Sequence, residues 1–244
     1  MSSRSAERAG AQPTRRAART ERTRLSRDGV LQTAVRLADR DGLDALTMRA
    51  LADDLGVEAM SIYHHLPNKN AILDGVVEVV FAEVESEVGG FGVPPTTDAA
   101  NWAPALRERI LGARRVLLRH PWAPWIMNAR GAPGPNAMRH IDGVVGIMRA
   151  GGMSFDLIHH SLHAIGSRVY GYVQELSDDG DAPAPAQLEQ LAGLAPNLAA
   201  MLAEVAHDDP DSTLGWCDDQ TEFEFGLDLL LEGIERRRAA EARD

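Results

Sequence analysis

The chain has 244 residues, of which 44% are hydrophobic and 25% charged, and its formal net charge at pH 7 is −11. This composition is typical of a soluble globular protein, and the acidic balance argues against a general nucleic-acid binder. The single cysteine, Cys217, excludes an internal disulfide. No apolar run approaches the roughly 20 residues of a membrane helix, so we expect a cytoplasmic protein without a membrane span.

Positive charge is concentrated in residues 1–24, which hold seven arginines and two acidic residues. The segment has no hydrophobic period, so we expect it to be a disordered arm. Two interpretations are open: an arm that contacts DNA phosphates or a minor groove, and a solvated tail without a role.

The first predicted helix runs from Ser26, its N-cap, to Arg40, and Gly42 ends it. Residues 46–69, LTMRALADDLGVEAMSIYHHLPNK, then have the apolar spacing of two short helices joined by a tight turn. Thr47 is placed to cap the first of these helices, and Gly56 is placed in the turn. This spacing is typical of a helix-turn-helix. Spacing alone leaves open a recognition helix and an ordinary helical hairpin with a polar outer face.

The rest of the chain is also predicted to be helical, which makes the fold all-α. A helix capped by Asn68 runs to about Val88, and the Gly- and Pro-rich loop 89–98 is the best domain boundary. The later predicted helices are Leu106–His120, Asn136–Arg149, a helix capped by Ser154 that runs to about Leu176, Leu188–Ala206 with an interruption at Pro196, and Thr221–Arg238. Residues 177–187 read as an acidic linker.

Residues 26–85 carry a dense motif, LTxRxLAxxLGVxxxxxYxHxxxKxxLL, within GLDALTMRALADDLGVEAMSIYHHLPNKNAIL. This stretch resembles the DNA-binding head of the tetracycline-repressor (TetR) family of bacterial regulators. The resemblance implies a three-helix head with a connecting helix in residues 25–88, and a helical ligand-binding and dimerisation domain in 89–244. It also implies a ligand-responsive regulator, most often a repressor, that binds a roughly palindromic operator as a homodimer.

The resemblance places the DNA contacts on the second and third helices of the head. Arg49 is expected to reach a base edge or a phosphate, and Met60 a thymine methyl group. Ala59 and Met60 have no hydrogen-bonding side chain, so DNA shape is expected to contribute to operator choice. The implied DNA-contact residues are Thr47, Arg49, Ala59, Met60, Ser61, Tyr63, His64, His65 and Lys69.

An effector pocket is expected where aromatic side chains gather among prolines and glycines, in residues 120–138. The candidate pocket residues are His120, Trp122, Trp125, Ile126, Met127, Met148, Phe155, Tyr170, Gln174 and Glu175. The alternative is that these aromatics are ordinary core. The tetracycline repressor binds its drug with magnesium through a histidine and a glutamate. Glu175 falls near the glutamate's place, but Ile126 or Met127 stands at the histidine's place. We therefore expect an apolar or aromatic effector without a cofactor.

The helix over residues 155–176 has a heptad-like apolar seam, and with the last helix it is expected to form a dimeric four-helix bundle. The candidate interface residues are Ile158, Leu162, Ile165, Val169, Phe223, Leu227, Leu230 and Ile234. His159 and His163 lie one turn apart without further ligands, so no metal site is expected.

Two other functions are open from the residues: a helical interaction module that does not bind DNA, and a helical enzyme. The sequence contains no recognisable nucleophile–base or metal constellation, so we do not expect an enzyme.

Overall fold

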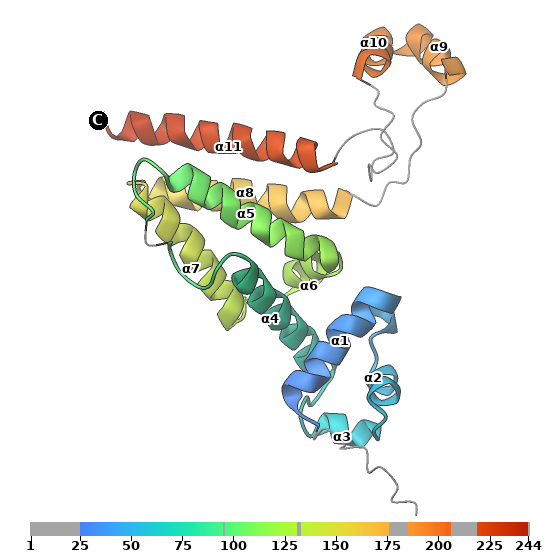
Figure 1. Ribbon diagram of the computed structural model, residues 1–244. Helices are drawn as coiled ribbons and strands as arrows, with labels where there is room; N and C mark the ends of the chain where they lie inside the picture. Colours follow the sequence, from blue (N-terminus) through green and yellow to red (C-terminus); the bar gives the residue numbers. More distant parts are fainter. Residues whose placement is uncertain (1–24, 95, 131–132, 176–184, 206–218, 244) are drawn as a thin grey trace, which may run out of the picture.

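The computed structural model describes residues 25–94, 96–130, 133–175, 185–205 and 219–243 (Figure 1). Within these ranges every regular element is a helix, which confirms the predicted all-α fold. The predicted arm (residues 1–24) and most of the predicted linker lie outside the described residues. In the described part of the chain, no helix combines the length and the apolar character needed to cross a membrane.

The head begins with helix α1 (Arg27–Asp41), whose first turn is capped by the Ser26 hydroxyl, as predicted. A short 3-10 turn (Leu43–Ala45) leads to α2 (Met48–Leu55), and α3 (Ala59–Tyr63) follows. Gly56 joins α2 to α3 with φ +63° and ψ +37°, a left-handed conformation that costs glycine little. The fully buried side chains of Leu46, Leu51, Ile62 and Leu66 close a small core in the head.

Helix α4 (Lys69–Glu87) connects the head to the rest of the molecule. The Asn68 side chain accepts from the Ala71 N–H and caps the helix, as predicted. In Figure 1, α4 runs from α1 up into the group formed by α5 (Trp102–Arg119), α6 (Ala123–Ala129) and α7 (Pro135–Ala150). The same helix therefore packs against α1 at one end and against α5 and α7 at the other.

The remaining helices are α8 (Phe155–Glu175), α9 (Pro185–Leu194), α10 (Pro196–Val205) and α11 (Asp219–Glu241). Pro196 separates α9 from α10, and it stands at the first position of α10, where proline is tolerated. Helix α6 was not predicted. Its Pro124 lies in the first turn, so the proline begins a short helix instead of breaking one.

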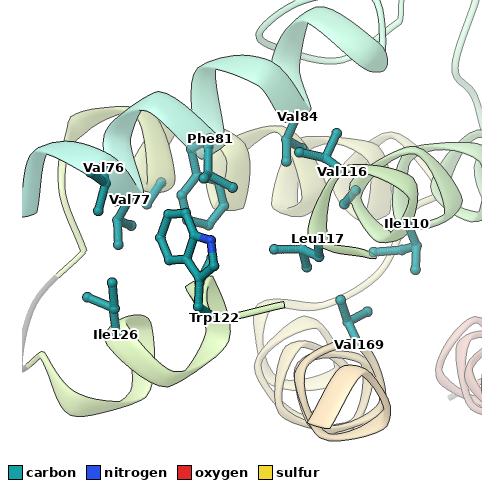
Figure 2. Close-up of a cluster of buried hydrophobic side chains, with 14 of the residues drawn as sticks. Val76, Val77, Phe81, Val84, Ile110, Val116, Leu117, Trp122, Ile126 and Val169 are labelled. Carbon is teal, nitrogen blue, oxygen red and sulfur yellow. The ribbon is translucent and has the colours of Figure 1, made fainter. Parts of the chain in front are cut away.

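One apolar core runs from the head through the larger domain. Figure 2 shows Trp122, which follows α5, against Val77 and Phe81 of α4, with Val84, Val116 and Leu117 further along the same layer. Burying a large side chain of this kind contributes about 1.5–3 kcal/mol. The head and the larger domain are thus joined by packing along α4 as well as by the chain.

Candidate DNA-contact face and effector cavity

The exposed side of α2 and α3 lies at the end of the molecule opposite α11 (Figure 1). Buried Ile62 anchors α3, so that Met60 and Tyr63 are left exposed on its other side. Arg49 is exposed in the first turn of α2. The Thr47 hydroxyl accepts from the Ala50 N–H at 3.1 Å, which leaves its own proton available to a phosphate.

Other predicted DNA contacts differ in exposure. His64 and Lys69 are exposed, and Ser61 and His65 are half-buried. Ala59 is also half-buried and packs against the head core, so this residue has a structural role as well as a place on α3. Arg49, Ala59 and Ser61 line one hollow beside α2 and α3, and the contacts of the predicted residues with DNA remain a prediction.

The negative charge of the head is partly paired. Arg40 donates to Asp41 at 2.8 Å and to Asp54 at 3.2 Å, and so ties α1 to α2. The hydrogen bond from Arg40 lowers the pKa of Asp41. Both members of the Arg40–Asp41 pair are well exposed, so solvent screens the pair and it contributes little to stability.

Two residues predicted to line a pocket instead join the head to the larger domain. Trp122 Nε1 donates to Asp39 Oδ1 of α1 at 2.7 Å, and His120 Nδ1 lies 2.8 Å from the same oxygen. His120 Nε2 lies 3.1 Å from Glu83 Oε2 of α4. The ring can donate at both positions only when both nitrogens carry protons. We call Asp39, Glu83, His120 and Trp122 the interdomain contact.

The other residues of the predicted pocket are dispersed. Trp125 is 63% exposed, and Phe155 is 68% exposed with the Arg149 guanidinium 4.5 Å from its ring centroid. Ile126 and Met148 are buried core, and Met127 is half-buried. The side chains of Gln174 and Glu175 lie outside the described residues. The aromatic residues of the predicted pocket are therefore divided among the core, the surface and the interdomain contact, and they do not surround one common space.

The structure has a cavity of about 590 Å³ between α4, α5, α7 and α8. Of the predicted pocket residues whose side chains the structure describes, Tyr170 lines this cavity. Most of its wall is aliphatic or aromatic, which is typical of a small-molecule site. The lining residues are Phe81, Val84, Ile110, Ala113, Leu117, His140, Ile141, Val144, His159, Leu162, His163, Ile165, Gly166, Ser167, Val169, Tyr170 and Gly171. Burial raises the pKa of Tyr170 to about 12, so its hydroxyl stays protonated at neutral pH.

A buried ionic cluster adjoins this cavity through His140, and its residues were not among the predicted site residues. Glu85 Oε1 of α4 accepts from Arg109 Nη2 of α5 at 2.7 Å and lies 2.7 Å from His140 Nδ1 of α7. Arg109 Nη1 also donates to the Gly92 carbonyl at 3.3 Å. Oε2 of Glu85 and Nε of Arg109 are buried without a hydrogen-bond partner among the described residues. We call Glu85, Arg109 and His140 the buried triad.

The buried triad requires a glycine beside it. A Cβ at Gly143 would lie 2.7 Å from Arg109 Nη2, so a side chain there would displace the guanidinium. A signal for the triad was present in the sequence. Glu85 follows Phe81 by one helical turn, on the apolar face of α4, where a carboxylate needs a buried partner.

The histidines of α8 lie at the surface of this helix. His159 and His163 are exposed at the edge of the cavity, with ring centroids 4.8 Å apart. Over the described part of the chain, no three histidine, cysteine, aspartate or glutamate side chains gather in a way that would hold a metal ion.

The apolar seam of α8 is used mainly within one chain. Leu162, Ile165 and Val169 line the cavity. Ile158, Phe223, Leu227 and Ile234 are buried in the core that α8 and α11 share, and Leu230 is half-buried. Seven of these eight side chains thus lie in the core or in the cavity wall of one chain, and their place in a dimer interface stays a prediction. The outward faces of α8 and α11 instead present His160, Phe225 and Leu229, and a groove lies between the two helices.

Comparison with known proteins identifies the family. Residues 30–76 match "Bacterial regulatory proteins, tetR family", and residues 94–238 match "Tetracyclin repressor-like, C-terminal domain". An HTH-type transcriptional regulator of Saccharopolyspora erythraea is 30% identical over 214 residues, which cover 86% of this chain and 84% of the relative. The HTH-type transcriptional repressor DrrR1 of Streptomyces coeruleorubidus is 29% identical, with 91% of this chain and 81% of the relative covered.

A solved structure supports the same assignment. ActR from Streptomyces coelicolor, in complex with actinorhodin, is 27% identical with a TM-score of 0.68, and the match covers 88% of this chain and 98% of that chain. The chain therefore belongs to the tetR family of bacterial regulatory proteins, and it is a ligand-responsive, DNA-binding transcriptional regulator.

Proposed function

We propose that the protein is a homodimeric repressor that leaves its operator when an apolar small molecule fills the cavity between α4, α5, α7 and α8. The observation that carries this proposal is that α4 serves two sites. Phe81 and Val84 on this helix line the cavity, and Glu83, between them, belongs to the interdomain contact. DrrR1 is named a repressor, and ActR has been solved with a bound small molecule, which supports both halves of the proposal.

The coupling between cavity and head follows from these shared elements. A ligand that displaces Phe81 or Val84 also displaces Glu83 and with it the His120 ring. His120 and Trp122 hold Asp39 of α1, so their movement changes the position of the head. A ligand acts in this way only if it binds the protein better in one position of the head than in the other. The coupling free energy between a ligand site and a DNA site is then typically about 1–3 kcal/mol.

The dimer is proposed to form through the outward faces of α8 and α11. These faces expose Phe225 and Leu229, and the groove beside them is lined by Leu157, Ala164 and Gly233. A symmetric pairing of two helices from each subunit would place the two copies of α3 about one DNA turn, roughly 34–36 Å, apart. Sedimentation at micromolar concentration should give a dimer, and Leu229→Glu should shift it toward monomer. A wild-type monomer would contradict this part of the proposal.

The cavity can be tested by filling it. A Cβ at Gly166 would meet nothing closer than 3.8 Å, so Gly166→Leu fits the backbone and projects into the cavity. We expect this variant to bind operator DNA as the wild type does and to lose release by every small apolar ligand that acts on the wild type. Gly193→Leu, on α9 with no neighbour within 4 Å, is the matched control. Unchanged release by Gly166→Leu would place the ligand elsewhere.

DNA binding can be tested on two exposed residues with different roles. Tyr63→Phe removes a phosphate donor, so binding should weaken on all sequences alike. Arg49→Ala should also reduce the preference for the operator over unrelated DNA, by about 1–3 kcal/mol if it contacts a base edge. Gel-shift titrations on operator and scrambled DNA measure both effects. Wild-type behaviour in both variants would refute the assigned DNA-contact face.

A further inference from the structure

We infer that the effector is a neutral aromatic molecule with a hydroxyl group that donates a hydrogen bond to Nε2 of His140. This inference rests on the proposed cavity and specifies the chemistry of its ligand. His140 is 6% exposed and is part of the cavity wall. It is a polar residue in a wall that is otherwise mostly apolar, so it is placed to orient a ligand.

The contact of Nδ1 with Glu85 sets the orientation of the His140 ring. Nδ1 lies 2.7 Å from Glu85 Oε1, at the distance of a charge-assisted hydrogen bond. Nε2 has no hydrogen-bond partner among the described residues. The Phe81 ring, whose centroid lies 5.5 Å from that of His140, also lines the cavity and limits the movement of the imidazole. The arrangement holds one nitrogen at the carboxylate and leaves the other for a ligand.

The protonation state of His140 follows from its surroundings. Burial lowers the pKa of His140, and the charge of Arg109 lowers it further, against the opposing effect of Glu85. The ring is therefore neutral at pH 7. A carboxylate only accepts hydrogen bonds, so the single proton lies on Nδ1, where it is donated to Glu85. Nε2 then carries a lone pair and acts as an acceptor.

This acceptor selects the ligand by charge and by donor capacity. A carboxylate or phosphate ligand would bring a second acceptor against Nε2. Arg109, the cation of the buried triad, already donates to Glu85 and to the Gly92 carbonyl. A cationic ligand would lose its hydration in an apolar wall that has no carboxylate among its described lining residues. The fitting partner is a neutral hydroxyl on an aromatic ring, because a phenol is a strong donor and its ring packs against Phe81 and Tyr170.

The test compares three probes that share one ring system: 2-naphthol, 2-methoxynaphthalene and naphthalene-2-carboxylate. Their binding to the full-length protein is measured by calorimetry. We expect 2-naphthol to bind about 3- to 10-fold more tightly than its methyl ether, which is the effect of one net hydrogen bond. The carboxylate should bind most weakly of the three.

Two variants then locate the effect at His140. In His140→Asn, the side-chain amide can still donate to Glu85, but no acceptor reaches the position of Nε2. The preference for 2-naphthol over the ether should disappear, while affinity for the ether is kept. His140→Phe, which retains a ring against Phe81, should behave in the same way. His160→Asn, at an exposed histidine of the same helix that is not among the cavity-lining residues, is the matched control and should keep the preference.

The outcomes separate this inference from the proposed cavity. If the wild type binds 2-naphthol and the ether equally, or if both His140 variants keep the wild-type preference, the inference is wrong and the cavity still stands. If no probe binds the wild type, or if Gly166→Leu binds all three as the wild type does, the proposed location of the cavity fails and the inference fails with it.

Discussion

Asp39→Ala is the substitution that most directly tests how the head is held. It removes the carboxylate of Asp39. Oδ1 of this carboxylate accepts from Trp122 Nε1 and lies within hydrogen-bond distance of His120 Nδ1. Each donor left unpaired in a buried site costs about 1–3 kcal/mol. The Asp39 side chain is 30% exposed, so water replaces part of the loss. We therefore expect each of the two donors to cost about 1–1.5 kcal/mol, near the lower end of that range, and the substitution to cost about 2–3 kcal/mol in total.

The assay has a stability readout and a functional readout. For a chain of this size, about 2–3 kcal/mol corresponds to a melting temperature lower by roughly 4–12 °C, measured at fixed protein concentration. The ratio of operator Kd values with and without effector should also move toward one, because α1 no longer follows His120 and Trp122. Operator binding without effector should persist, since the exposed face of α2 and α3 is unchanged.

Asp41→Ala is the control, because it removes the same charge two residues later. Asp41 pairs with Arg40 at the surface and is not part of the interdomain contact, so its loss should lower the melting temperature less than Asp39→Ala does and should leave the effector response intact. If Asp39→Ala and Asp41→Ala have the same melting temperature and the same effector response, the interdomain contact neither stabilises the protein nor couples the head to the effector.

Three further predictions concern single positions. Gly143→Ala should lower the free energy of unfolding by about 1–3 kcal/mol in urea titrations, because the new Cβ would lie 2.7 Å from Arg109 Nη2. An unchanged free energy of unfolding would show that the buried triad adjusts freely. Gly56→Ala should cost about 1–2 kcal/mol through its positive φ alone, since no atom lies within 4 Å of the new Cβ; an unchanged melting curve would contradict this. Burial lowers the pKa of His140 below the ordinary 6.5, so the unfolded chain takes up this proton first and stability should fall as the pH drops below 6.5. The fall in the free energy of unfolding should be smaller in His140→Asn. Identical slopes of this free energy against pH in the two proteins would refute the prediction.

The helix ends and the helix-turn-helix could be predicted because their causes are local. The hydroxyls of Ser26, Thr47 and Ser154 each accept from an N–H three residues later, as their positions before apolar runs predicted. Gly56 has the left-handed conformation that its place in the turn indicated. Such signals depend on a few neighbouring residues, which a sequence displays directly.

The cavity could not be placed from the sequence because its wall is assembled from four helices that are far apart in the chain. Aromatic density around Trp122 and Trp125 was a poor guide, since one ring fills the core and the other is exposed. The seam of α8 was a real apolar stripe, but periodicity alone does not tell whether such a stripe faces a neighbouring helix of the same chain, a cavity or a second subunit. Leu162 and Val169 line the cavity, and Ile158 faces the core.

The shared position of α4 has a consequence for engineered regulators that exchange heads between relatives. A junction placed in the loop after Glu87 would transfer α4 with its head, and the new α4 would then meet an unrelated α5 and α7. A junction placed before Lys69 would keep the cavity wall intact but would separate Asp39 from Glu83. A working hybrid of this protein should therefore match residue 39 of the incoming head to His120 and Trp122 of the recipient. Compatibility between the halves thus depends on a few matched side chains as well as on the choice of operator.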